Sequence, residues 1–176
     1  METARKPKSE LPLAQSVVPI FAAGESINQM LIEHIAPAIW TMKPPGNVRT
    51  IAAIFTHMHN VRTKWIRLTA PHLQVPAQLS RSRCTPQKAL EALAGSSRQC
   101  ERMLADVEAG RIKKFVRDGW ARPWPVGPDA VFAMLSYMLV HEAHHRGQVS
   151  MLAHQMGFPL PGDITGRMWN WKGLWS

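Results

Sequence analysis

Hydrophobic residues recur at steps of three and four along most of the chain, and joints rich in proline or glycine interrupt this pattern. Such spacing places apolar side chains on one face of an α-helix. The joints divide the chain into four helical segments, which cover residues 15–36, 47–70, 85–109 and 129–155. We therefore predict an all-α fold, a four-helix bundle whose helices bury their apolar faces against one another.

The ends of these helices carry recognisable signals. Pro37 ends the first helix, and Asn47 is a candidate N-cap for the second. Thr85 followed by Pro86 is the preferred start of a helix, with a capping side chain and then proline in the first turn. Gly157 is placed to end the fourth helix. The third helix is the best defined of the four, because both of its ends are marked.

Two regions fall outside the four helices. Residues 111–128 contain several glycines and prolines, which predicts a structured loop with little strand content that covers one end of the bundle. Near the C-terminus, Trp169, Trp171 and Trp175 lie close together in sequence. Because tryptophan is seldom left in water, we expect this tail to pack on the bundle or on a partner chain.

The composition is that of one globular domain. With 176 residues, 45% hydrophobic and 19% charged, the chain can bury one sizeable core, and we assign residues 1–12 to a flexible tail and 13–176 to a single domain. No apolar stretch reaches the roughly 20 residues of a membrane helix, and no signal-peptide core follows the N-terminus, so we expect a cytoplasmic protein without membrane contact. Cys84 and Cys100 form no metal or redox motif and are expected to be reduced.

The chain is basic, with 21 lysines and arginines against 12 aspartates and glutamates and a formal net charge of +9. Such a charge attracts nucleic acid or an anionic small molecule. The positive residues are spread along the chain, however, with short clusters only at 81–83 and 111–114. Nucleic-acid binding is therefore the less favoured alternative.

Three histidines are candidates for metal ligands. His141 and His145 lie four residues apart, about 40° around a helix axis, so that both imidazoles can reach one ion. Both continue the inward stripe of the fourth helix, and His57 lies on the inward stripe of the second. A single inward histidine is most often a core residue with hydrogen bonds, but three together favour a site for one divalent transition metal.

The remaining histidines receive other assignments. His59 is turned by about 200° from His57 and is expected to face outward. His34 and His144 could face a substrate or hydrogen-bond a ligand. His72 and His154 are expected on the surface.

Residues 141–145 also match the H-E-x-x-H motif, in which Glu142 would be the general base of a zinc protease. The extended form of that motif requires glycine and histidine where this chain has Gln148 and Met151, and such proteases use a sheet edge to hold peptide. We favour Glu142 as a partner that holds an imidazole or an arginine between helices. A role as base on a metal-activated water stays open.

Three motifs together resemble a known family: His57-Met58-His59-Asn60-Val61-Arg62 with Trp65, then the run from His141 to Gln148, then Trp169-Asn170-Trp171. The chain resembles DinB/YfiT-like proteins. This resemblance implies a four-helix bundle with up-down-down-up connectivity, often homodimeric. It also implies a metal site of zinc, nickel or iron type, with His57, His141 and His145 at the ligand positions.

The resemblance leaves the reaction open. Members of the family include S-transferases and an isomerase that depend on a low-molecular-weight thiol, and others are described as metal-dependent hydrolases or damage-inducible proteins. A small-molecule thiol S-transferase is our first expectation and a metal-dependent hydrolase the second. A non-enzymatic metal- or damage-responsive binding protein is the alternative from another class. Arg62 and Arg146 could orient the carboxylates of an acidic thiol cofactor, but ordinary salt bridges on helix flanks are favoured.

Overall fold

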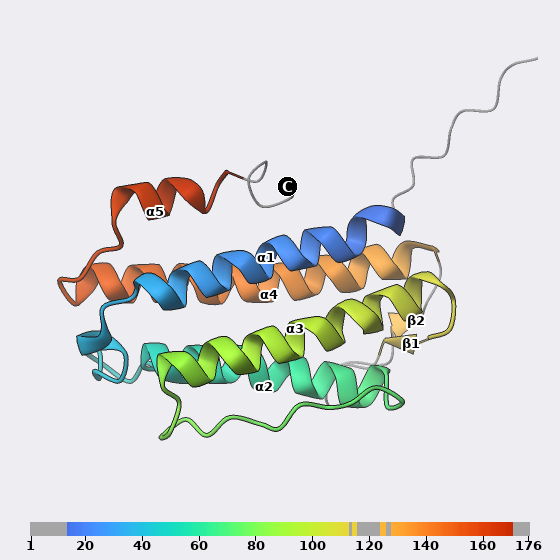
Figure 1. Ribbon diagram of the computed structural model, residues 1–176, viewed down its shortest axis with the longest axis horizontal. Helices are drawn as coiled ribbons and strands as arrows, with labels where there is room; N and C mark the ends of the chain where they lie inside the picture. The colour runs from blue at the N-terminus through green and yellow to red at the C-terminus, as the bar shows by residue number, and fades with distance from the viewer. Residues whose placement is uncertain (1–13, 113, 116–123, 126–127, 171–176) are drawn as a thin grey trace, which may run out of the picture.

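The computed structural model describes residues 14–112, 114–115, 124–125 and 128–170, and the fold is helical, as predicted (Figure 1). The four long helices are α1 (Ala14–His34), α2 (Ile51–Thr69), α3 (Pro86–Glu108) and α4 (Pro128–Gln155). A 3-10 turn at Pro37–Ile39, two short strands, β1 (Lys114–Phe115) and β2 (Trp124–Pro125), and a last short helix, α5 (Gly162–Arg167), complete the described elements. None of the described helices is long and apolar enough to cross a membrane.

One end of the bundle is filled by a cluster of buried apolar side chains, here called the first apolar cluster. It includes Leu31, Ile51, Leu93 and Val149, one from each long helix. These residues come from the C-terminal halves of α1 and α4 and from the N-terminal halves of α2 and α3. The first and fourth helices therefore run toward this end, and the second and third run away from it (Figure 1).

The opposite end holds a second apolar cluster, which again draws on all four long helices. Its members include Phe21, Ile66, Met103 and Met138. Because α2 and α3 run in the same direction, the segment between them has to return along the length of the bundle, and residues 70–85 do so on the outside (Figure 1). The bundle thus has two hydrophobic ends joined by a middle section.

The middle section is polar, although it is buried. Its buried members are Glu25 and Asn28 of α1, His59 and Arg62 of α2, Ser96 and Ser97 of α3, and Glu142 and His145 of α4. We call this set the buried polar layer. Buried polar groups lower stability unless they are hydrogen-bonded, so a whole layer of them has to be internally paired.

The helix ends agree with the sequence signals at three of four places. The fourth helix, α4, ends at Gln155, just before Gly157, whose φ is +82°. Thr85 caps α3 through its side chain, which accepts from the Lys88 backbone N–H at 3.3 Å, as predicted. The first helix ends at His34, ahead of Pro37. The predicted N-cap of α2 at Asn47 is wrong: Thr50 fills that position and accepts from the Ala53 N–H at 3.1 Å. Both residues are good caps, and the packing of Ile51 fixes where the helix begins.

Among the described residues between α3 and α4, β1 and β2 form one short antiparallel pair. Phe115 of β1 is buried in the second apolar cluster, so this loop does cover that end of the bundle. Near the C-terminus, Trp169 is 80% exposed, so it does not pack on the bundle, and packing on a partner chain stays a prediction. Trp171 and Trp175 lie outside the described residues, as does the tail assigned to 1–12.

Candidate metal centre

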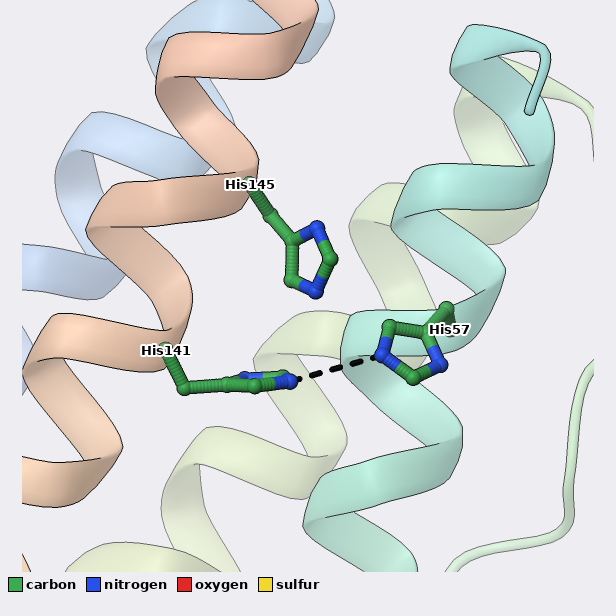
Figure 2. A group of neighbouring side chains, drawn as sticks. All are labelled: His57, His141 and His145. Carbon is green, nitrogen blue, oxygen red and sulfur yellow. Dashed lines mark hydrogen bonds between the residues drawn. The ribbon is translucent and has the colours of Figure 1, made fainter. Parts of the chain in front are cut away.

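The three histidines singled out from the sequence converge between α2 and α4 at mid-height in the bundle (Figure 2). One ring nitrogen from each of His57, His141 and His145 lies within 4.8 Å of the others. The ring centroid of His57 is 4.8 Å from that of His145, and the centroids of His141 and His145 are 4.6 Å apart. Two residues one helical turn apart on α4 and one residue on α2 thus face a common point.

The distance between two of these nitrogens suits a tetrahedral ion. A Zn–N bond length of about 2.0–2.1 Å and a tetrahedral angle place two ligand nitrogens about 3.4 Å apart. The Nε2 atoms of His57 and His141 are 3.4 Å apart. In the described part of the chain the buried Nδ1 of His141 has no hydrogen-bond partner. The residues therefore fit a divalent transition metal, with the Nε2 atoms as the natural donors.

Gln148 orients the imidazole ring of His145 through a hydrogen bond. Its Oε1 lies 2.7 Å from Nδ1 of His145, so that ring nitrogen is the donor and carries the proton. The other nitrogen, Nε2, is then left with a lone pair directed away from Gln148. The Gln148 amide nitrogen in turn lies 3.0 Å from Nε2 of the exposed His144. A fixed tautomer of this kind is what a metal-binding imidazole requires.

The electrostatic surroundings keep all three rings neutral near pH 7. Burial lowers the pKa of His57 to about 4, and the positive charge of Arg49 is the next contribution. Burial likewise lowers the pKa of His141 to about 4, followed by the neighbouring His145. The pKa of His145 is also lowered, chiefly by burial. A neutral imidazole has the free lone pair that a metal ligand needs, and a protonated one does not.

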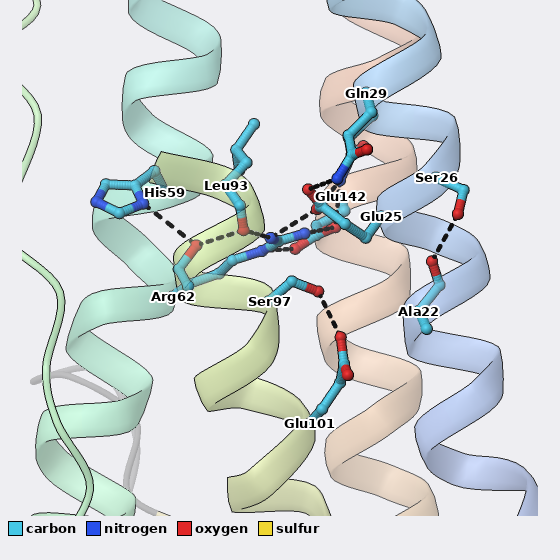
Figure 3. A network of polar contacts seen from close by, with 12 residues as sticks. Ala22, Glu25, Ser26, Gln29, His59, Arg62, Leu93, Ser97, Glu101 and Glu142 are labelled. Carbon is cyan, nitrogen blue, oxygen red and sulfur yellow. Dashed lines mark hydrogen bonds and ion pairs between the residues drawn. The ribbon is translucent and has the colours of Figure 1, made fainter. Parts of the chain in front are cut away.

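Glu142 faces the buried polar layer instead of the histidines (Figure 3). Its Oε1 accepts from Arg62 Nε at 2.6 Å, and its Oε2 accepts from Arg62 Nη2 at 2.7 Å and from Asn28 Nδ2 at 2.9 Å. Burial raises the pKa of Glu142, but the Arg62 guanidinium outweighs burial and the resulting pKa lies below its ordinary value. Both oxygens are committed, so the H-E-x-x-H interpretation with Glu142 as general base loses its support.

The interpretation of Arg62 as a residue on a helix flank is wrong, since its side chain is completely buried. Its Nη1 pairs with Glu25 Oε2 at 2.7 Å and donates to the Leu93 carbonyl at 3.1 Å. Its guanidinium also lies over the Phe21 ring, 5.1 Å from the centroid. Arg62 thereby connects all four helices, and its complete burial keeps it away from a cofactor.

Arg146 completes the charge balance of this layer. Its Nη1 donates to Asn28 Oδ1 at 3.2 Å and lies 3.9 Å from Glu142 Oε2. Two arginines therefore face two glutamates, and the layer has no net charge when all four are ionised. On α4, Glu142 and Arg146 directly follow His141 and His145, so the ionic layer fixes the turn of the helix that carries two of the candidate ligands.

His59 does not face outward as expected; its side chain is fully buried. Its Nε2 donates to the Ala77 carbonyl at 2.8 Å, and its Nδ1 lies 3.2 Å from Ser96 Oγ. Beside it, Asn60 exchanges two hydrogen bonds with the backbone of Leu79. Helical periodicity missed this because the segment 70–85, which returns along α2, covers the face that a lone helix would expose.

The other histidines are peripheral. His34 is exposed, and its Nδ1 lies 2.8 Å from the Met30 carbonyl, so it faces neither the centre nor the cavity described below. His72 is exposed and pairs with Asp106, and His154 is exposed, both as expected for surface residues. His144 approaches the centre only through Gln148.

Sequence reasoning missed Glu25 and Asn28, which contribute to the buried polar layer from α1. The available signal was their spacing from Phe21 and Leu31, at steps of three and four along a face that is otherwise apolar. Polar residues at such positions indicate a buried partner elsewhere in the fold. The sequence alone does not say that the partners are Arg62 and Glu142.

A cavity of about 750 Å³ lies next to Gln148, and none of the three histidines is among its lining residues. Its walls come from the segment between α1 and α2, from the first turn of α2, and from the last turns of α4. The lining residues include Asn47, Val48, Arg49, Gln148, Met151 and Gln155. Gln148 belongs both to the cavity wall and to the hydrogen bond that orients His145, so the cavity and the centre share a side chain.

Fold and site together define the class: a helical bundle with a histidine cluster suited to a metal between two of its helices. The sequence model of the DinB family matches residues 14–172, and the protein therefore belongs to the DinB family. A crystal structure described as that of a candidate DinB family member from Exiguobacterium sibiricum 255-15 matches this fold with a TM-score of 0.55. The identity is 18%, and the match covers 88% of this chain and 98% of that chain. No curated protein matches the chain significantly.

Proposed function

We propose that this protein is a divalent-metal-dependent enzyme whose metal is held by His57, His141 and His145. The observation that carries the proposal is the convergence of three neutral imidazoles, within 4.8 Å of one another, beside a cavity large enough for a small molecule. Ligand pockets of proteins have volumes of roughly 300–1,000 Å³. A small-molecule substrate in this cavity would contact Gln148, which is hydrogen-bonded to the candidate ligand His145.

A catalytic role is favoured over a purely structural one. Three protein ligands leave a coordination position free, whereas structural sites of this kind usually saturate the ion with four. The bundle is also packed at both ends by apolar clusters that do not involve the three histidines. The hydrophobic core is therefore complete without the metal.

Thiol transfer is the first candidate reaction. A bound divalent metal would supply positive charge that deprotonates a thiol or a water near neutral pH. Since both Glu142 oxygens are committed to Arg62 and Asn28, the adjacent acid in the sequence cannot take the proton. A free thiol has a pKa of about 8.5 and water about 15.7. A metal therefore has to lower the pKa of a thiol much less than that of water to deprotonate it near neutral pH. This favours an S-transferase, with a metal-dependent hydrolase as the second candidate.

The alternative from another class is a metal- or damage-responsive binding protein without catalytic activity. In that case the metal would stabilise the bundle, and the cavity would have no reacting ligand. The neutral, paired state of the buried polar layer argues for a bundle that is stable by itself. We therefore rank this alternative below the enzyme.

The test is elemental analysis of protein purified without a histidine tag, before and after reconstitution with zinc, nickel or iron. The native chain is expected to hold about one equivalent of metal, and the His141→Ala variant to hold far less. His154→Ala is the matched control: it removes an exposed histidine in the last turn of the same helix and should keep the metal.

A native chain that holds no metal after reconstitution, or equal metal in His141→Ala and the native chain, would overturn the proposal. Where metal is bound as expected, consumption of a small thiol in the presence of an electrophile separates transfer from hydrolysis. Transfer consumes the thiol, and hydrolysis proceeds without it.

A further inference from the structure

Arg49 carries a positive charge close to the candidate metal site. It lies in the wall of the cavity, just ahead of α2, and its side chain is exposed. In the described part of the chain no carboxylate pairs with it. Gln148 lines the same cavity, and its Oε1 lies 2.7 Å from Nδ1 of His145, so Arg49 shares the cavity with a side chain that contacts the centre.

Outside the buried polar layer, the arginines that act on the centre are positive and no acidic side chain lines the cavity. Arg81, from the segment that returns along α2, also acts on His57. The nearby Glu142 is neutralised by Arg62 within the buried polar layer. Among the described residues that line the cavity, none is acidic and Arg49 is the charged one. With a divalent ion in place, the positive potential at the cavity would rise further, and an anion is the ligand that relieves it.

The rest of the cavity wall is a mixture of amides and apolar side chains. Asn47 and Gln155 offer amide donors and acceptors, whereas the amide of Gln148 is bonded to His145 and His144. Val48 and Met151 are exposed to 57% and 62%, which is unusual for apolar side chains next to a charged group. A ligand with an apolar part would cover them, and methionine adapts well to such contacts.

We propose that this cavity binds a carboxylate ligand with an apolar portion, that Arg49 receives the carboxylate, and that Val48 and Met151 contact the apolar portion. The inference rests on the proposed function, since the ligand would be the substrate or co-substrate of the metal centre. Arginine suits this task, because its planar guanidinium can donate two parallel hydrogen bonds to a carboxylate. Arg49 is thus a specificity-determining residue.

The test uses hexanoate as the probe and its neutral analogue hexanamide as the control ligand. Binding to the metal-reconstituted protein is followed through the labelled methyl groups of the methionines. Met151 should shift on binding, and the fully buried Met103, in the second apolar cluster, should not. The variants are Arg49→Gln, Arg49→Lys and Met151→Glu, with Arg83→Gln as a control at an exposed arginine outside the cavity.

The native protein is expected to bind hexanoate more tightly than hexanamide. Arg49→Gln should weaken hexanoate binding about tenfold or more, because a hydrogen bond to a charged group is lost. Arg49→Lys should recover part of the affinity, Met151→Glu should repel the carboxylate, and Arg83→Gln should behave as the native chain. The metal content of Arg49→Gln should be unchanged.

Equal affinity for hexanoate in Arg49→Gln and the native protein would overturn the inference, as would equal affinity of the native protein for the acid and the amide. Hexanoate binding that depends on His141 and not on Arg49 would also overturn it, since the carboxylate would then be bound by the metal alone. Metal bound without such discrimination leaves the proposed function standing and removes this inference. If the protein bound no metal but still preferred hexanoate to hexanamide through Arg49, the inference would stand and the proposed function would be removed.

Discussion

Arg62 and Glu142 form a two-pronged ion pair at the centre of the bundle, with nitrogen–oxygen distances of 2.6 and 2.7 Å, and both side chains are buried. Glu142 is the residue that follows His141 on α4. The pair therefore connects the helix of His57 to the helix of the other two candidate ligands. It sets the distance and rotation between the two helices that form the centre.

Replacing Glu142 with alanine should destabilise the protein by about 3–5 kcal/mol, because it leaves the buried Arg62 charge without its main partner. Urea denaturation measures this change. The control is Glu91→Ala, at an exposed glutamate on α3, which should change the free energy of unfolding by less than about 0.5 kcal/mol. A Glu142→Ala variant as stable as the native chain would contradict this account.

Removing the metal with a chelator should leave the helices in place. The two apolar clusters hold the bundle without the histidines, so the metal contributes only its binding free energy to stability. We expect the helical circular dichroism to be kept and the unfolding temperature to fall by about 10 °C or less. Complete unfolding on chelation would instead support the structural-metal alternative.

The His59→Ala variant should loosen the segment 70–85 without affecting the metal. Its bonds to the Ala77 carbonyl and Ser96 are lost, which should cost about 1–3 kcal/mol and speed proteolysis within this segment. His154→Ala, at an exposed position, is the control for both measurements. Loss of metal from a folded His59→Ala protein would contradict the assignment of His57 to the metal site and of His59 to the packing of residues 70–85.

Two glycines at α3 should respond oppositely to alanine. Gly95 lies within the helix, where a Cβ would meet only Arg98 Nη2, at 4.0 Å, so alanine should stabilise the protein by about 0.5–1 kcal/mol. Gly110 follows the helix end with φ of +69°, so alanine there should cost about 1 kcal/mol or more. Thermal unfolding of both variants checks the pair, and a shift of the same sign in both would refute the argument.

The sequence by itself determined the helical fold, the start of α3 at Thr85 and the three histidines that converge. These features depend on local rules. Periodicity fixes which side of a helix is apolar, capping fixes where a helix begins, and a spacing of four residues brings His141 and His145 together regardless of the rest of the chain. His57 could be predicted as the third candidate ligand because it lies on the apolar stripe of its own helix.

Only the tertiary structure decided what each polar side chain faces. Whether His59 is buried depends on the path of residues 70–85, and whether Glu142 acts as a base or an ion-pair partner depends on where α2 places Arg62. Arg49 reaches the cavity only because the segment before α2 folds beside the end of α4. Each of these outcomes rests on contacts between residues far apart in the sequence, and helical periodicity carries no information about which distant segment will cover a given face.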